Sequence, residues 1–230
     1  MWADPSSWSV LVTGGSSGLG AAVCSALGRA GSRVLSLDRR ESADADTITV
    51  DLADTAAAER ATLDAVARLG ELDAVVCCAG IDSPGSLSTT TREAWDRVVS
   101  VNLLGLAAVV RSAMPALAER RGRVVTVAST LGHRAVGDAT AYCASKFGVV
   151  GFTRALAAEL RGDVGVTLLT PGGMHTAFFD DRAEQYKPPP DACLADPVEV
   201  AAAVMWVLGR PPGIEVKELA VMAPGEASWP

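Results

Sequence analysis

The sequence predicts an α/β fold: a doubly wound sheet of seven parallel strands with helices on both faces, formed as one domain by residues 1–230. Short apolar runs recur along the chain, and each is followed by a longer alanine-rich segment. The runs are apolar throughout rather than alternating, as in strands that are buried on both faces. A hydrophobic fraction of 49% over this length provides enough apolar material for one large core.

Composition also places the elements in chain order. Strands are predicted where β-branched and apolar residues lie between turn residues, at 9–13, 33–38, 47–52, 74–79, 123–129, 164–170 and 217–222. Helices are predicted over the segments between them, at 18–30, 55–68, 92–100, 103–120, 139–161 and 197–208. Thr55 and Asp196 are expected to cap two helix starts, with Pro197 at the first helical position. Residues 173–195, long for a loop in a compact domain, are predicted to form a short substrate lid, which we call the lid segment.

Charge and hydropathy argue against several classes of partner. The formal net charge is −7 and no basic run could neutralise a row of phosphates, so we expect no nucleic-acid partner. No apolar stretch reaches the roughly 18 to 20 residues of a membrane span, and residues 1–9 lack the basic start of a secretory signal. We therefore expect a cytoplasmic protein without a membrane partner, and we assign no metal site. The five cysteines have no paired spacing and are interpreted as reduced, buried thiols.

The turn after the first strand has the composition of a phosphate cradle. Residues 13–20 read Thr-Gly-Gly-Ser-Ser-Gly-Leu-Gly and lead into the first predicted helix. Glycines let the backbone approach a pyrophosphate, and a helix N-terminus offers it unpaired N–H donors. A tight turn without any ligand explains the glycines equally well, because a lone glycine pattern is weak support for binding.

An acidic residue follows at the spacing expected for a dinucleotide. Asp38 ends the second strand eighteen residues after Gly20, where a carboxylate can bond the ribose hydroxyls of NAD and repel the 2′-phosphate of NADP. We therefore expect NAD, with NADP as the alternative because Arg39 or Arg40 could pair with that phosphate. Asp51 lies where it could bond the adenine amino group, and it could equally cap a helix.

Three further residues predict proton chemistry at the same edge of the sheet. Tyr142 and Lys146 stand four residues apart in a helical segment, so their side chains share one face. A phenol with a pKa of about 10 is a poor acid or base at neutral pH, and a nearby ammonium stabilises its phenolate. Ser129 ends a predicted strand, which places its hydroxyl at the carboxyl edge where ligands bind. Each residue alone has a structural explanation, but together they predict one active site.

The order of these features resembles the short-chain dehydrogenase/reductase family, from the first strand to about Thr176. The family's glycine turn, T-G-x-x-x-G-x-G, is matched by Thr13, Gly14, Gly18 and Gly20. Its catalytic tetrad of Asn, Ser, Tyr and Lys is matched by Asn102, Ser129, Tyr142 and Lys146. The resemblance implies a Rossmann fold and an NAD(P)-dependent oxidoreductase that interconverts a secondary alcohol and a ketone by hydride transfer.

The resemblance also implies a role for each residue. Tyr142 would be the general acid or base, Ser129 would hydrogen bond the reacting oxygen, and Lys146 would lower the phenol pKa and bond the ribose. Asn102 would hold a water that links Lys146 to solvent, although from the residues alone it caps a helix that begins at Leu103. The cofactor would be bound by Gly14, Ser16, Ser17, Gly18, Leu19, Gly20, Asp38, Arg39, Asp51, Leu52, Ala79, Gly80, Tyr142, Lys146, Pro171, Gly172 and Thr176.

The sequence departs from the family pattern after the fourth strand. Cys77 and Cys78 replace two asparagines there, which should change local hydrogen bonding, while Ala79 and Gly80 still let the cofactor approach. The substrate pocket is expected to be mostly apolar, with no arginine aimed at a carboxylate or phosphate. Its predicted residues are Leu131, His133, Val136, Met174, Phe178 and Phe179.

Two other functions stay open. A 3-oxoacyl thioester (acyl-carrier-protein) reductase would fit if Arg120, Arg121 and Arg123 met an acidic carrier, although cations near a helix C-terminus also complement its dipole. A cofactor-sensing protein without turnover would keep the glycine turn, and the intact tetrad argues against it. The expected partners are a small carbonyl or alcohol substrate and a second copy of the chain, because residues 103–120 and 139–161 are the helices through which the family forms homodimers or homotetramers.

Overall fold

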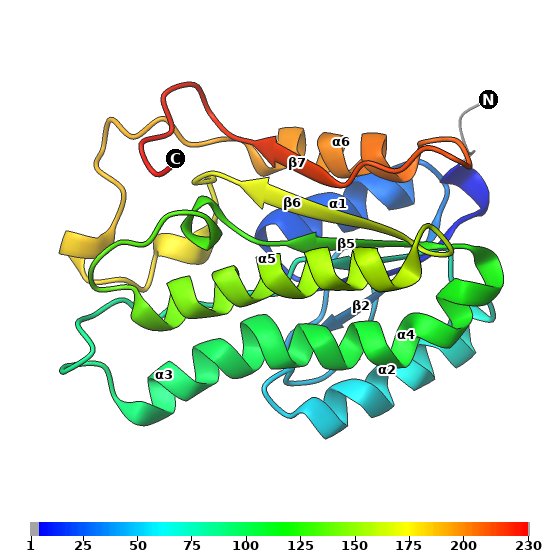
Figure 1. Cartoon of the computed structure of the whole chain (residues 1–230), viewed down its shortest axis with the longest axis horizontal. Coiled ribbons are helices and arrows are strands. Elements are labelled where there is room, and N and C mark those ends of the chain that lie inside the picture. The colour runs from blue at the N-terminus through cyan, green and yellow to red at the C-terminus, as the bar shows by residue number, and fades with distance from the viewer. Residues whose placement is uncertain (1–4, 230) are drawn as a thin grey trace.

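Apolar, β-branched runs form the sheet, as the sequence predicts. Within residues 5–229, which the computed structural model describes, seven strands pair in parallel in the order β3-β2-β1-β4-β5-β6-β7 (Figure 1). The predicted doubly wound parallel sheet is therefore confirmed. The strands are β1 (Ser9–Thr13), β2 (Arg33–Asp38), β3 (Asp46–Thr49), β4 (Ala74–Cys77), β5 (Arg123–Val127), β6 (Gly165–Pro171) and β7 (Glu218–Val221).

Helices cover both faces of the sheet and divide the core into two. In Figure 1, α1 and α6 lie on one face, and α2, α4 and α5 lie on the other. Alternate residues of β1 serve the two cores: Leu11 packs with α2 and α4, while Val10 and Val12 pack with α1 and α6. These helices are α1 (Gly18–Arg29), α2 (Thr55–Leu69), α4 (Leu106–Arg120), α5 (Thr140–Leu160) and α6 (Pro197–Leu208).

The predicted break between the third and fourth helices is absent. Helix α3 (Arg92–Val99) continues through a π-helical turn, η2 (Ser100–Gly105), directly into α4. Gly105 lets this turn approach the preceding loop, because a Cβ there would lie 2.4 Å from the carbonyl oxygen of Leu52. Asn102 is buried inside this continuous helix and does not cap a helix start, which corrects that interpretation.

Aspartates cap two of the helix starts. Asp54 accepts a hydrogen bond from the backbone N–H of Ala57 at 2.9 Å, so Thr55, predicted as the cap, is the first residue of α2 instead. Asp196 accepts from the N–H of Val198 at 2.8 Å and precedes Pro197, as predicted. A carboxylate at these positions also complements the positive end of the helix dipole.

Only one helix among the described residues is long and apolar enough to cross a membrane by length and composition. It is the joined helix of residues 92–120. Half of its most apolar window is buried inside the fold, as in the core helices of soluble proteins, so it is weak support for a membrane span.

The cysteines are free thiols, but they are not all buried. Cys24, Cys77 and Cys143 lie in the core, and Cys78 is partly buried. Cys193 is exposed because it lies in the lid segment, which corrects the prediction for this residue.

The chain reverses the direction of sheet growth between β1 and β4, which creates the crevice where open α/β sheets bind ligands. Thr13, at the carboxyl end of β1, links this strand to the segment that follows β4. Its hydroxyl accepts from the N–H of Ala79 at 3.1 Å, and its carbonyl accepts from the N–H of Cys78 at 3.2 Å. The glycine turn after β1 and the segment after β4 are therefore fixed side by side.

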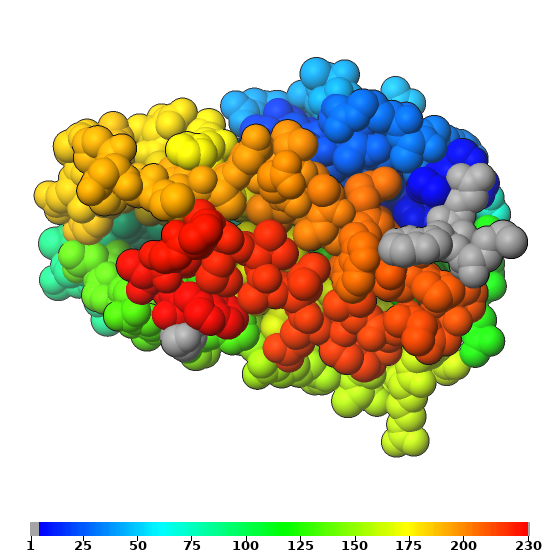
Figure 2. Space-filling view, turned by 90° about the horizontal axis from the view of Figure 1, so that it is seen from above, coloured from blue at the N-terminus to red at the C-terminus, as the bar shows by residue number. Residues whose placement is uncertain are grey.

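The lid segment is a loop with a closed base beside this crevice. The N–H of His175 donates to the carbonyl of Ala195 at 2.9 Å, and the N–H of Ala195 donates to the carbonyl of Gly173 at 2.8 Å. The carboxylate of Glu226 accepts from the N–H of Gly173 at 2.9 Å, which ties the C-terminal segment to the same point. Figure 2 shows the loop in yellow and orange next to the C-terminal segment in red. Two short 3-10 turns, η4 (Ala177–Phe179) and η5 (Glu184–Tyr186), give the loop internal structure.

Candidate active site

The turn after β1 leaves the N-terminus of α1 without a side-chain cap. Gly14 and Gly18 have φ values of 76° and 54°, a conformation that glycine adopts without strain. Ser17, at the N-cap position, makes no capping hydrogen bond, and the buried Oγ of Ser16 has no partner among residues 5–229. Open donors at a helix N-terminus beside a glycine-lined approach fit a pyrophosphate group.

Asp38 lies at the far side of this turn. Its carboxylate accepts from the backbone N–H of Ser16 at 3.0 Å and of Arg40 at 3.1 Å, so it is held in place at the end of β2. A carboxylate held there can accept from ribose hydroxyls and repels a 2′-phosphate. Arg39 and Arg40 line the same cleft, so groups suited to either cofactor are present.

Asp51, predicted to bond the adenine amino group, lines the cleft. Its carboxylate accepts from the N–H of Ala53 at 3.0 Å and from the guanidinium of Arg97 at 2.8 Å. Burial acts to raise the pKa of Asp51, but these hydrogen bonds and the charge of Arg97 outweigh it, so the pKa lies below its ordinary value. Asp51 does not cap α2, because Asp54 occupies that position.

Tyr142, in the first turn of α5, meets Ser129 at the carboxyl end of β5. Burial raises the pKa of Tyr142 to about 12, and a hydrogen bond with the Ser129 hydroxyl acts in the opposite direction. Ser129 is itself oriented by the turn η3 (Thr130–Gly132), since its Oγ accepts from the N–H of Leu131 at 3.2 Å. The ring of Phe178 lies 5.8 Å from the ring of Tyr142, centroid to centroid, and covers it from the lid segment.

Lys146 lies one helical turn after Tyr142 and is only 4% exposed. Its ammonium donates to the carbonyl of Val127 at 2.9 Å and lies 5.7 Å from the centroid of the Tyr142 ring. Burial lowers the pKa of Lys146 to about 8, while nearby Cys78 and Asp82 act to raise it. The pKa of Tyr142 is raised rather than lowered, so the predicted effect of Lys146 on the phenol stays a prediction.

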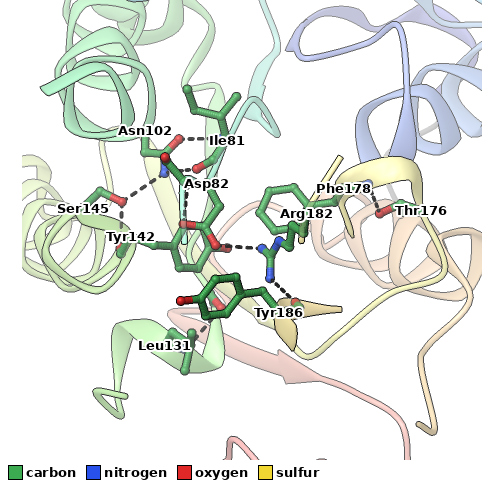
Figure 3. Close-up of polar contacts among 12 residues, drawn as sticks. Ile81, Asp82, Asn102, Leu131, Tyr142, Ser145, Thr176, Phe178, Arg182 and Tyr186 are labelled. Atoms are coloured by element: carbon green, nitrogen blue, oxygen red, sulfur yellow. Dashed lines mark hydrogen bonds and ion pairs between the residues drawn. The ribbon is translucent and has the colours of Figure 1, made fainter. Parts of the chain in front are cut away.

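Asn102 connects the π-turn to the segment after β4. Its amide group donates to the carbonyl of Ile81 at 2.9 Å and to the hydroxyl of Ser145 at 3.0 Å, and its Oδ1 accepts from the N–H of Ile81 at 2.8 Å. The Ser145 hydroxyl donates onward to the carbonyl of Tyr142 at 2.8 Å (Figure 3). The buried amide of Asn102 therefore links the backbone of Ile81, after β4, to the backbone of Tyr142 in α5 through the hydroxyl of Ser145.

Replacing Asn102 by Ala is expected to lower the free energy of unfolding by about 2 to 4 kcal/mol, because it removes the hydrogen-bond partner of the partly buried N–H and carbonyl of Ile81. Urea unfolding followed by circular dichroism measures the change. Ser145→Ala is the matched control, since it removes the hydroxyl without touching Ile81, and we expect a loss of about 1 kcal/mol. Equal losses in the two variants would contradict this account.

The cleft that contains these groups has a volume of about 1300 Å³. All the residues predicted to bind the cofactor line it, as does Ser129, while Asn102 lies outside its lining. Of the predicted substrate-pocket residues, His133 does not line the cleft: its Nε2 lies 3.0 Å from the Thr170 hydroxyl, and its ring is 5.8 Å from that of Trp229. The predicted pocket residues that do line it are Leu131, Val136, Met174, Phe178 and Phe179.

The thiols of Cys77, at the end of β4, and of Cys78, directly after it, have raised pKa values. Burial raises the pKa of Cys77 to about 12 and that of Cys78 well above its ordinary value, despite the charge of Lys146. Cys77 belongs to the core, and Cys78 lines the cleft beside Ala79 and Gly80. Neither thiol replaces the hydrogen bonding of an amide, and the backbone here is tied by Thr13 instead.

Sequence reasoning missed an ion pair in the cleft. Arg182, on the lid segment, donates to the carboxylate of Asp82 at 2.8 Å, and the two side chains are 15% and 6% exposed. The Tyr186 hydroxyl also donates to Asp138 at 3.2 Å, which ties the lid segment to the loop before α5. Arg182 lines the cleft but is paired with a carboxylate of the chain itself, so the expectation that no arginine is aimed at a carboxylate or phosphate of the substrate stays a prediction. The partners are 100 residues apart and lie outside any motif, so no sequence signal could have joined them.

Comparisons with known proteins agree with this geometry. A family model described as short chain dehydrogenase matches residues 9–187. Acetoacetyl-CoA reductase of an Acinetobacter species is 31% identical, over 87% of this chain and 90% of the relative. Glycine betaine reductase of Emericella nidulans is also 31% identical, over 92% of this chain but only 18% of the relative. The solved ligand-free structure of Thermoplasma acidophilum aldohexose dehydrogenase shares the fold, with a TM-score of 0.86 and 24% identity over 96% of this chain and 94% of that one.

Proposed function

The chain belongs to the short-chain dehydrogenase family, and from that premise we propose that it interconverts a secondary alcohol and a ketone with NAD as its cofactor. Membership itself makes it an oxidoreductase that acts on CH–OH groups. The observation that carries the finer proposal is the convergence of Ser129, Tyr142 and Lys146 on the wall of one cleft that also contains the glycine turn.

Proton transfer is assigned to Tyr142. When bound, the nicotinamide cofactor accepts or supplies the hydride. Tyr142 gives a proton to the carbonyl oxygen in reduction or takes one from the alcohol in oxidation, while Ser129 hydrogen bonds the same oxygen. The raised pKa of Tyr142 keeps its proton available for the reductive direction.

Lys146 supplies positive charge beside the phenol. With a pKa of about 8 it carries its proton at neutral pH, and it would hold the nicotinamide ribose. An ammonium near a phenol favours the phenolate, which supports the oxidative direction. Asn102 acts on this pair indirectly, because its hydrogen bonds hold Ile81 and Ser145.

The choice of cofactor rests on Asp38. Purified protein should bind NADH more tightly than NADPH by roughly 10-fold or more, because the carboxylate of Asp38 repels a 2′-phosphate. Nicotinamide fluorescence and thermal stabilisation measure both affinities, and Asp38→Asn should reduce the difference. Tighter binding of NADPH would overturn the choice of NAD, and Arg39→Ala and Arg40→Ala would then show which arginine holds the phosphate. Binding of neither nucleotide would overturn the enzyme mechanism as proposed.

A 3-oxoacyl thioester reductase is the second candidate, favoured by the similarity to acetoacetyl-CoA reductase. The arginines considered for carrier docking do not line the cleft and are already engaged. Arg120 contacts Asp73 at 3.1 Å and Arg121 contacts Asp163 at 3.8 Å, and Arg123 donates to the carbonyl of Arg210 at 2.6 Å at the amino end of β5. Comparing kcat/KM for a 3-oxoacyl thioester and for the matching simple ketone separates the two candidates.

Self-association and location complete the proposal. We propose a homodimer or homotetramer through residues 103–120, which comprise the end of η2 and α4, and through α5, where Leu104 and Phe147 respectively are 48% and 45% exposed. Sedimentation measures this state, and Phe147→Asp should shift it toward the monomer. We also propose a cytoplasmic location, where the free cysteine thiols stay reduced.

A further inference from the structure

A buried ion pair lies beside the proton-transfer residue without belonging to the tetrad. Asp82 comes from the segment after β4 and Arg182 from the lid segment, and Figure 3 shows both next to the ring of Tyr142. The carboxylate of Asp82 accepts from the N–H of Ser83 at 2.7 Å and from Arg182 at 2.8 Å. Burial keeps the pKa of Asp82 above its ordinary value, while the charge of Arg182 and the hydrogen bond from Ser83 act to lower it.

The lid segment holds the guanidinium of Arg182 in a fixed place. The guanidinium carbon lies 4.8 Å from the ring centroid of Phe178 and 4.6 Å from that of Phe179, and Nη1 lies 3.4 Å from the carbonyl of Tyr186. Phe178 in turn covers Tyr142. Arg182 therefore contacts Asp82 only while the lid segment lies against Tyr142 and the cleft, a position that we call seated.

The groups that act on Tyr142 come from α5, from the segments after β4 and β5, and from the lid segment, while α3 packs against it with the uncharged side chains of Val98 and Trp95. The hydroxyl of Ser129 and the charge of Arg182 lower the pKa of Tyr142, while Asp82 and Cys143 raise it. Lys146 shares the helix, and Asp82 raises its pKa as well. Asp82 and Arg182 thus oppose each other at the phenol, and as a pair they are close to neutral.

We propose that Asp82 and Arg182 are positioning residues that set the pH at which Tyr142 releases its proton. The pair has this effect only while the lid segment lies against the cleft, because only then does Arg182 contact Asp82. With Arg182 in place, the charge of Asp82 is compensated and the phenolate is tolerated. With the lid segment displaced, Asp82 faces the phenol alone and the proton stays on Tyr142. The inference rests on the proposed role of Tyr142 and adds a link between closure over the site and proton transfer.

Three variants test this by the sign of their effects. Arg182→Met should raise the midpoint of the pH profile of kcat for alcohol oxidation by about one pH unit, and Asp82→Asn should lower it by a similar amount. The double variant should return toward wild type, because it removes a nearly neutral pair. Arg154→Met, which breaks an ion pair with Glu218 in which both side chains are about half exposed, is the matched control and should leave the midpoint unchanged.

A second readout separates this inference from the proposed reaction. The protein has two tyrosines, so the near-ultraviolet absorbance of phenolate, with Tyr142→Phe to identify the signal, follows the titration of Tyr142 without any turnover. Shifts of opposite sign in Arg182→Met and Asp82→Asn support the pair. Shifts of the same sign, or none in folded variants, overturn it, whereas a wild-type protein that turns over no alcohol overturns the reaction alone. Asp82→Asn keeps the side-chain shape and should fold. If Arg182→Met does not fold, a lower pKa of Tyr142 in Asp82→Asn supports the proposal, and an unchanged or higher pKa overturns it.

Discussion

Replacing Tyr142 by Phe should lower turnover by at least about 100-fold while NADH binding stays close to that of the wild type. The substitution removes only the hydroxyl, which is the group that we propose exchanges a proton with the substrate. The ring and its contact with Phe178 remain, so the fold and the cofactor cleft should be preserved. Steady-state kinetics with a panel of ketones and a fluorescence titration with NADH measure the two quantities separately.

The chain contains its own control for this experiment. Tyr186, the second tyrosine, also lines the cleft, but its hydroxyl donates to Asp138 rather than meeting Ser129. Tyr186→Phe should therefore change kcat by less than about threefold, the effect of one hydrogen bond of about 0.5 kcal/mol. Turnover retained in Tyr142→Phe would remove Tyr142 from the mechanism.

Replacing Gly20 by Ala should weaken NADH binding by about 5- to 150-fold, if the one to three kcal/mol that overpacking costs appears in the binding free energy. A Cβ at Gly20 would lie 2.0 Å from the carbonyl oxygen of Gly14 and 2.6 Å from its carbonyl carbon. Both atoms are backbone, so the glycine turn itself has to move, and its approach to a pyrophosphate changes with it.

Gly28→Ala, in the same helix, is the matched control. The nearest atom to a Cβ at Gly28 lies 3.9 Å away, which is an ordinary contact. Its NADH affinity should be unchanged and its stability slightly higher, because alanine favours helix over glycine by about 1 kcal/mol. Equal affinity of Gly20→Ala and wild type in a fluorescence titration would show that the turn does not form the nucleotide site.

The layout of the sheet followed from the sequence because it depends on local properties. Apolar runs without alternation identify strands with two buried faces, and right-handed crossovers then leave few arrangements for seven of them. The strand limits were less certain: β3 ends at Thr49 and β4 at Cys77, before the predicted ends. After those residues one more backbone hydrogen bond follows in each case, from the N–H of Val50 to Asp38 and from the N–H of Cys78 to Thr13, before the chain turns toward the cleft. Composition cannot distinguish this ending from a longer strand.

Some residues of the site could be predicted from the sequence and others could not. Glycines, Asp38 and the tetrad have fixed spacings because each lies at the end of a strand or in the adjacent helix, so sequence order carries their position. The ion pair of Asp82 and Arg182 has no such spacing, since it depends on how a long loop folds back over the sheet. The prediction that His133 lines the substrate pocket was wrong for a related reason. His133 lies near Ser129 in sequence, but the turn η3 directs its ring toward Thr170.

The π-turn at Asn102 has a consequence for how this helix could change during evolution. One extra residue in a helix rotates everything beyond it by about 100°, so α3 and α4 present faces that a regular helix could not present together. Deleting a single residue between Ser100 and Gly105 would give a more regular helix and would turn the amide of Asn102 away from Ile81. Relatives of this chain should therefore tolerate substitutions in the turn more readily than a change in its length.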